Sequence, residues 1–141
     1  MTKKLSRKKD HRELMQRNLL TSLVLYEKIV TTKPKAKQLS SLFDRLISKA
    51  KDNDSNAKRN VNSILLDKKA SAKVFDILIQ RYSKRTSGLT SIANLSPRKG
   101  DNSEICQIIL LDRKVKSDLA VDGDKNNIIN DKGRSDESDK K

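Results

Sequence analysis

The amino-acid sequence predicts an α+β fold with the element order α-β-α-α-α-β-β. Two observations lead to this prediction. Apolar residues recur at three- and four-residue spacing through most of the first 82 residues, as in helices packed on a core. Short apolar or β-branched runs bounded by turn residues indicate the strands. The chain has 141 residues, 34% of them hydrophobic and 3% aromatic, so we expect one domain with a modest core.

The chain opens with a basic arm and a first helix. Six cations stand in the first 12 residues against one acid, Asp10. Residues 1–9 lack periodicity, and we expect them to form an extended arm. Asp10 and Glu13 have the spacing of a capping box, which predicts that the helix begins here. Its expected apolar stripe consists of Leu14, Met15, Leu19, Leu23 and Tyr26.

The next two elements are a strand over residues 28–32 and a helix that begins at Lys33-Pro34. The strand sequence, KIVTT, is short and β-branched. Proline suits a first helical turn because it has no amide hydrogen to leave unpaired there. This helix has the clearest periodicity in the sequence and should be the main element of the core. Its predicted buried positions are Ala36, Leu39, Leu42, Phe43, Leu46, Ile47 and Ala50.

Two more helices and two strands complete the predicted domain. The segment 52–55 (DNDS) can cap a third helix, and a fourth fits Asp67 to about Tyr82. Strands over residues 89–95 and 105–111, joined by a turn-rich loop, should pair as an antiparallel hairpin. The expected buried positions in the two helices are Ala57, Val61, Ile64, Leu65, Ala70, Val74, Phe75, Ile77 and Leu78.

The last part of the chain differs in composition. Residues 113–141 hold eight cations and seven acids mixed with Asn, Ser and Gly, which predicts a disordered tail. Residues 1–112 keep 24 cations and 11 acids, a net charge of +13 out of the +14 of the whole chain. We therefore divide the chain into an arm (1–9), a basic α/β domain (10–112) and a tail (113–141). Such a charge indicates an anionic partner.

Several classes of protein do not fit the sequence. No apolar run approaches the ~18 residues of a membrane span, and the basic N-terminus lacks the features of a signal peptide, so we expect a cytoplasmic protein. Cys106, the single cysteine, is expected to be a small buried hydrophobe. With one cysteine and one histidine the chain offers no zinc site or catalytic triad. Since phosphate-binding loops and hydrolase motifs are also missing, we predict no enzyme, no cofactor and no metal.

The candidate functional residues are cations, hydroxyls and the single histidine, which could contact RNA phosphates. They occur in the arm, at the start of the second helix and on later helices and loops. The alternative interpretation is a solubilising arm and ordinary solvated helix faces. For His11 the alternative is a half-exposed capping residue. Because aromatics are scarce, binding should use phosphate, sugar and shape rather than base stacking. The candidates are Lys3, Lys4, Arg7, Lys8, Lys9, His11, Arg12, Arg17, Thr31, Thr32, Lys33, Lys35, Lys37, Arg59, Arg81, Arg85, Arg98 and Lys99.

Two blocks of the sequence hold an ordered set of short motifs. Residues 3–37 contain His11-Arg12, an Arg-Asn-Leu at residues 17–19, Thr-Ser-Leu at 21–23, Glu-Lys-Ile at 27–29, Thr31-Thr32 and Lys-Ala-Lys at 35–37. A second block runs from Val74-Phe75 to the Arg-Lys-Gly-Asp of residues 98–101. In order and spacing these motifs resemble the bacterial-type large-subunit ribosomal protein seventeen family. The similarity covers residues 3–112.

The resemblance implies a two-layer α/β domain with helices on one face of a small mixed sheet. It also implies a structural role in translation, as a ribonucleoprotein component of the large ribosomal subunit. The partners would be ribosomal RNA, near the outer end of the peptide exit tunnel, and neighbouring ribosomal proteins. It adds Asn18 to the candidate RNA contacts. One departure concerns residues 87–91 (SGLTS), which lack an aromatic and an arginine that the family pattern has there.

Two alternative functions were weighed against this one. A free-standing DNA-binding or architectural protein would need an exposed row of base-reading side chains, but the second helix uses its clearest stripe for the core. An RNA-processing enzyme would need carboxylates grouped around a metal. The candidate acids Asp52, Asp54, Asp67 and Asp76 are better explained as helix caps and helix surface.

Overall fold

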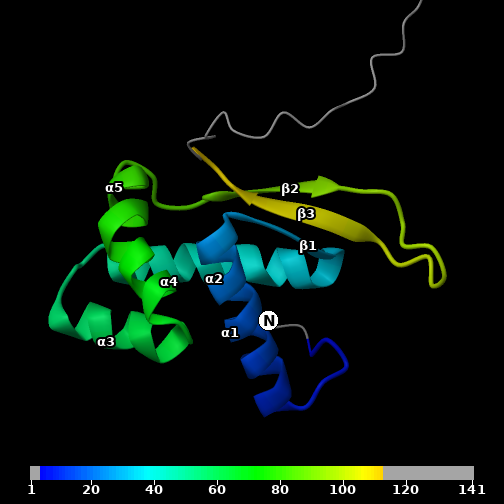
Figure 1. Ribbon diagram of the computed structural model, residues 1–141, viewed down its shortest axis with the longest axis horizontal. Coiled ribbons are helices and arrows are strands. Elements are labelled where there is room, and N and C mark those ends of the chain that lie inside the picture. The colour runs from blue at the N-terminus through cyan, green and yellow to red at the C-terminus, as the bar shows by residue number, and fades with distance from the viewer. Residues whose placement is uncertain (1–3, 113–141) are drawn as a thin grey trace, which may run out of the picture.

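The structure of the chain, a computed structural model, describes residues 4–112 (Figure 1). Lys3 and the tail 113–141 lie outside these described residues. The predicted element order is confirmed, with the fourth helical region divided by a π-helical turn. The elements are α1 (Lys9–Tyr26), β1 (Lys28–Thr32), α2 (Lys33–Ala50), α3 (Ser55–Ile64), α4 (Lys68–Lys73), the π-helix η1 (Val74–Leu78), α5 (Ile79–Arg81), β2 (Thr90–Asn94) and β3 (Ile105–Leu110).

The three strands form one sheet with the order β1-β3-β2, and the helices lie on one side of it (Figure 1). β3 pairs antiparallel with both neighbours, so the expectation of a mixed sheet is wrong. β2 and β3 run in opposite directions because a single loop joins them. β1 runs in the same direction as β2, but β3 separates the two, and no parallel pair forms. The predicted hairpin of the two late strands is confirmed.

The sheet buries one face and leaves the other open. Side chains alternate between faces along a strand, and on β3 the residues Cys106, Ile108 and Leu110 are buried while those between them are half-buried. Cys106 is thus a core residue, as expected. Ile29 lies opposite Ile108 and packs on the same core. The helices therefore cover the face that holds Ile29, Cys106 and Ile108.

Helix α2 lies at the centre of the molecule and contacts α1, α3, η1 and all three strands. Its predicted stripe is confirmed at six positions, while Leu42 is half-buried. Phe43 is fully buried and meets the ring of Tyr82 edge to face, with centroids 6.2 Å apart. Full burial of a side chain such as Phe43 contributes about 1.5–3 kcal/mol to the free energy of unfolding.

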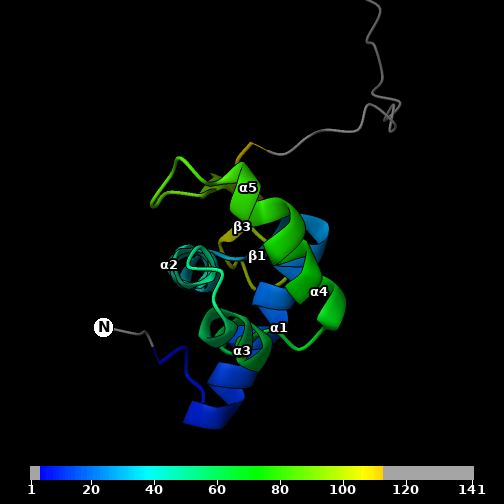
Figure 2. The same cartoon turned by 90° about the vertical axis from the view of Figure 1, so that its left-hand side faces the viewer.

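The expectations for α1 are wrong about where the helix begins and about two residues of the apolar stripe, since Leu14 and Tyr26 at its two ends are 49% and 69% exposed. The helix begins at Lys9, and its N-cap residue, Lys8, makes no side-chain capping bond, so Asp10 lies inside the first turn. Only the C-terminal half of α1 packs on the core, through Leu20, Leu23 and Val24. The N-terminal half projects beyond the other helices (Figures 1 and 2). This projection explains why Leu14, which fits the apolar stripe, is 49% exposed.

The fourth helical region runs from Lys68 to Arg81 and includes the π-helical turn η1. Its buried apolar residues, continued by Tyr82 just after its end, are four apart: Ala70, Val74, Leu78 and Tyr82. A π-helical turn holds more residues than an α-helical one, so the buried face follows this wider spacing. Ile77 was expected in the core but is 46% exposed for this reason.

The arm is not extended where the structure describes it. Residues 4–7 form a tight turn closed by the amide of Arg7 on the carbonyl of Lys4 at 3.3 Å. Leu5 and Ser6 have left-handed backbone angles, φ 52° and 51°, which is uncommon for residues other than glycine. The guanidinium of Arg12 donates to the carbonyls of Lys4 and Arg7, at 3.4 and 3.3 Å, and holds this turn against α1.

Candidate nucleic-acid interface

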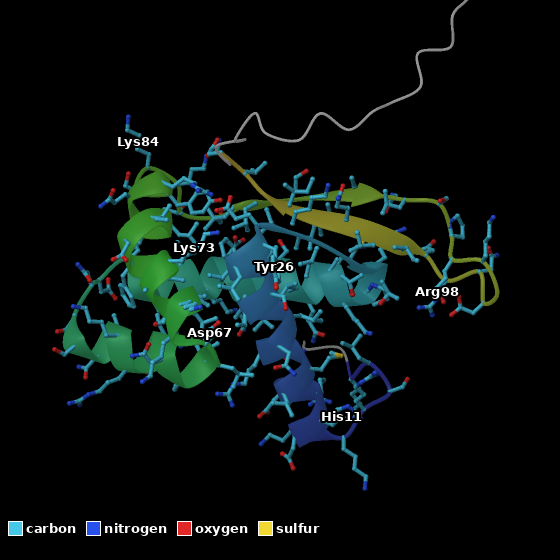
Figure 3. All side chains as sticks on the ribbon, in the orientation of Figure 1. His11, Tyr26, Asp67, Lys73, Lys84 and Arg98 are labelled. Atoms are coloured by element: carbon cyan, nitrogen blue, oxygen red, sulfur yellow. The ribbon has the colours of Figure 1, made fainter. Side chains whose placement is uncertain are left out.

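The turn of the arm gathers cations at the projecting end of α1. Lys4, Lys8, Lys9 and His11 are exposed there, and Arg7 is half-buried. Figure 3 shows His11 at this end of the molecule. Within residues 4–112, none of the ion pairs involves a side chain of the arm. The arm therefore presents unneutralised charge on a braced backbone, with Arg12 as the brace rather than as a free contact.

The start of α2 is the second predicted cluster. Thr31 and Thr32 are adjacent on β1, so their side chains point to opposite faces of the sheet and do not converge on one phosphate. Lys33 is bound to Glu104 twice. The backbone amide of Lys33 donates to the carbonyl of Glu104 at 3.2 Å, and the Lys33 ammonium lies 3.0 Å from the Glu104 carboxylate. Lys35 is half-buried and Lys37 exposed. The lysines, more than the threonines, form the accessible part of this cluster.

Two predicted contact residues are bound to other elements of the protein. The guanidinium of Arg17 donates to the carbonyl of Ile64 at 3.1 Å and to that of Ser63 at 2.5 Å, which satisfies acceptors at the C-terminal end of α3. Arg81 is paired with Glu27, and its side chain is 13% exposed. Both arginines therefore join elements of the fold, while Asn18, next to Arg17, is exposed.

The remaining candidates are on the surface. Arg85 lies 3.2 Å from the carboxylate of Asp112, and Arg98 makes two hydrogen bonds to Asp101 within the hairpin loop. These hydrogen bonds raise the pKa of Arg98 and, with the bonds from Ser103, lower that of Asp101. Exposed pairs of this kind contribute little to stability. Arg59 and Lys99 are exposed as well.

A buried ion cluster that the sequence did not indicate centres on Glu27. This residue ends α1 in a left-handed conformation, φ 59°, and is 8% exposed. Its carboxylate lies 2.8 Å from Lys73 and 3.0 Å from Arg81. Burial acts to raise the pKa of Glu27, but the hydrogen bonds from Arg81 and Lys73 outweigh it and hold that pKa below 4.5. Figure 3 shows Lys73 beside the end of α1 that carries Tyr26.

The loop before β2, where the sequence departs from the family pattern, is anchored to α2. The carboxylate of Asp44 accepts from the amides of Gly88 and Leu89, each at 3.2 Å. Gly88 has φ +65°, a conformation that glycine adopts at little cost. Leu89 is completely buried. At this point the chain contributes an apolar core residue rather than a surface contact.

The described residues form neither a metal site of clustered ligands nor a membrane span. Residues 4–112 contain no group of three or more His, Cys, Asp or Glu side chains placed to hold a metal ion. In the same residues no helix combines the length and the apolar character needed to cross a membrane. Fold and surface together define a small basic α+β protein whose most prominent surface feature is a cationic end.

Comparison of the sequence with models of known protein families identifies the family. The model of the family described as ribosomal protein L17 matches residues 15–111. The chain belongs to this family, and the resemblance deduced from the short motifs is confirmed. It is accordingly a structural constituent of the large ribosomal subunit and not an enzyme.

Individual relatives agree with this membership. The large ribosomal subunit protein bL17 of Rickettsia bellii (strain OSU 85-389) is 41% identical over 133 residues, which cover 93% of this chain and 94% of the relative. The protein of the same name from Endomicrobium trichonymphae is 43% identical over 101 residues, 72% of this chain and 86% of the relative. That of Hyphomonas neptunium is 39% identical over 120 residues, covering 85% and 86%.

Proposed function

We propose that this protein binds and stabilises folded ribosomal RNA in the large subunit, chiefly through the turned arm. The observation that carries the proposal is the cluster Lys4, Arg7, Lys8 and Lys9, which has no ion-pair partner among residues 4–112. Lysines that neutralise phosphates release condensed counterions, and this release drives binding without reading sequence. Lys33, Lys35 and Lys37 extend the contact along the start of α2.

The fold supports this role by fixing the position of the arm. Arg12 holds the turn of the arm to α1, and Arg17 holds α1 to α3, so the cations stand on a projection that is hydrogen-bonded to the rest of the fold. A preformed arrangement loses less conformational entropy on binding than a flexible tail does. The arm would lock neighbouring RNA helices in place, with other ribosomal proteins as further neighbours near the outer end of the exit tunnel.

Sedimentation of a lysate that contains the tagged protein tests this function. The protein should travel with assembled ribosomes and stay with the large subunit when low magnesium separates the two subunits. The variant Lys4→Ala/Lys8→Ala/Lys9→Ala should shift toward the top of the gradient. A matched variant, Arg45→Ala/Lys49→Ala/Lys84→Ala, also removes three exposed cations but none of the proposed contacts, and should stay bound. Equal behaviour of the two variants would remove the arm from the proposal, and release by DNase would indicate a DNA partner.

A further inference from the structure

A groove between α3 and α4 lies apart from the arm and from the start of α2. Its volume is about 560 Å³, within the roughly 300–1,000 Å³ typical of ligand-binding clefts. Lys58 and Asn62, one turn apart on α3, line one wall. Lys68 and Ser71 of α4 line the other. Figure 3 shows Asp67 at the junction where α4 begins, between the two walls.

The floor of this groove is apolar and includes an aromatic ring. Leu65 is 4% exposed, and Leu66 beside it is 50% exposed. Phe75 packs against the core with part of its side chain and lines the groove with the rest. The sequence indicated a Phe75 buried in the core and no surface for base stacking. A half-buried phenylalanine in a groove offers the kind of flat apolar surface on which unpaired bases stack.

The polar groups of the groove suit a ligand that carries both a base and phosphates. The Oδ1 atom of Asn62 accepts a hydrogen bond from Ser71, which fixes the amide and leaves its Nδ2 group as a donor. Lys58 and Lys68 place one cation on each helix. The single acid of the groove, Asp67, accepts from the amide of Lys69 at 2.8 Å as a helix cap. The net charge at the groove is therefore positive.

We infer that this groove receives one unpaired nucleotide of the ribosomal RNA, an inference that rests on the proposed function. The base lies on Leu66 and Phe75, Asn62 donates to its edge, and the flanking phosphates lie near Lys58 and Lys68. An apolar segment of a neighbouring protein would fill the floor equally well. It would leave both lysines without a counter-charge, so the charge of the groove favours the nucleotide.

Photocrosslinking in assembled large subunits tests the identity of the occupant. The photoreactive residue p-benzoylphenylalanine replaces Leu66 in the groove, Ile77 as a control, or Lys8 in the arm of the full chain. Ile77 is 46% exposed in η1, which continues from α4, and lies outside the groove. The probe at 66 should crosslink to ribosomal RNA at one nucleotide, and the probe at 77 should not reach that nucleotide. A crosslink from 66 to a protein, or none at all, overturns the inference. If the probe at 8 also fails to reach RNA, the proposed function fails as well.

A second experiment measures the contribution of the groove to binding. Leu66→Glu places a negative charge beside the expected phosphates, and Ile77→Glu makes the same change outside the groove. Loss of one base-stacking contact corresponds to roughly tenfold weaker binding of ribosomal RNA fragments. Leu66→Glu should show this loss and expose one base to dimethyl sulfate, while Ile77→Glu should do neither. Equal affinity and equal base protection in the two variants would contradict the inference. Circular dichroism establishes that both variants are folded.

Discussion

The carboxylate of Glu27 accepts two hydrogen bonds from the guanidinium of Arg81, at 3.0 and 3.2 Å, across 54 residues of sequence. Lys73 joins the same carboxylate at 2.8 Å and also donates to the carbonyl of Leu25. The backbone carbonyl of Glu27 accepts from the amide of Leu110 on β3. One residue thus connects the end of α1 with the fourth helical region and with the sheet.

Removal of the Glu27 charge should lower the stability of the fold. In Glu27→Gln the cations of Lys73 and Arg81 lose their counter-charge in a largely buried position. We expect the free energy of unfolding to fall by about 2 kcal/mol, as for other hydrogen bonds to buried charged groups. Urea unfolding, monitored by circular dichroism, measures this change in the free energy of unfolding. Glu104→Gln makes the same change in the exposed pair with Lys33, so it is the control and should leave stability nearly unchanged.

The same cluster should make stability depend on pH. Because the pKa of Glu27 is lower in the folded chain than its ordinary value of 4.5, its ionised form stabilises the fold above that value. This contribution is lost as the pH falls through the folded pKa. The difference in unfolding free energy between the wild-type chain and Glu27→Gln should therefore be largest at neutral pH and shrink below about pH 4.5. A difference that stays constant down to pH 3 would argue against an ionised Glu27.

The hydroxyl of Tyr82 should stabilise the end of the sheet. It donates to the carbonyl of Leu111 at 2.6 Å, while the ring packs on Phe43. Tyr82→Phe keeps the ring and removes the hydrogen bond, which should cost about 1 kcal/mol. Thermal unfolding measures the loss. Tyr26→Phe is the matched control, because Tyr26 is 69% exposed and should tolerate the change.

Arg17 and Lys8 should separate a structural role from a binding role. Arg17→Ala removes the donors to the carbonyls of Ser63 and Ile64, so we expect about 1–2 kcal/mol less stability. Lys8→Ala removes an exposed arm cation and should weaken RNA binding without changing the melting temperature. Melting curves and filter binding on both variants give the comparison. If Arg17→Ala keeps its stability but binds RNA more weakly, Arg17 is an RNA contact and not a structural residue.

Binding of ribosomal RNA should depend steeply on salt. If ~6–10 phosphates are contacted, affinity should fall by roughly 10³–10⁵ between 50 and 200 mM salt. Each lost phosphate contact lowers the slope of log affinity against log salt by ~0.7–0.9. The variant Lys4→Ala/Lys8→Ala/Lys9→Ala should therefore lower that slope by about 2–3. The control variant, which removes Arg45, Lys49 and Lys84, should keep the wild-type slope. If the slope falls equally in both variants, RNA is attracted by the overall positive charge and not by contacts of the arm.

The parts of the fold that the sequence predicted are those set by local pattern. The stripe of α2 and the β-branched run of β1 depend on neighbouring residues in the chain, and both agree with the structure. The predicted burial of the α1 stripe was wrong at its N-terminal end, because periodicity shows which side of a helix is apolar but not which end projects from the domain. Leu14 fits the pattern and is 49% exposed because, within residues 4–112, no other helix or strand lies over that end of α1.

The site was harder to predict because it depends on distant partners. In the sequence Arg17 and Lys8 are both cations near a basic arm, yet one is bound to α3 and the other is exposed. Whether a cation is available to a ligand depends on carbonyls and carboxylates that lie 46 to 54 residues away. The sequence did not indicate the ion pairs of Glu27 for the same reason, since its partners Lys73 and Arg81 come from the fourth helical region.

The strand order has a consequence for how the chain matures. β3 is the last strand to be synthesised and lies between β1 and β2, so neither of these has a backbone partner in the sheet until residues 105–110 have left the translating ribosome. Pairing across such sequence distances is slow compared with helix formation. A nascent chain that stops before Ile105 would have helices but no sheet. Only a chain translated past Leu110 would then present the complete fold to a growing subunit.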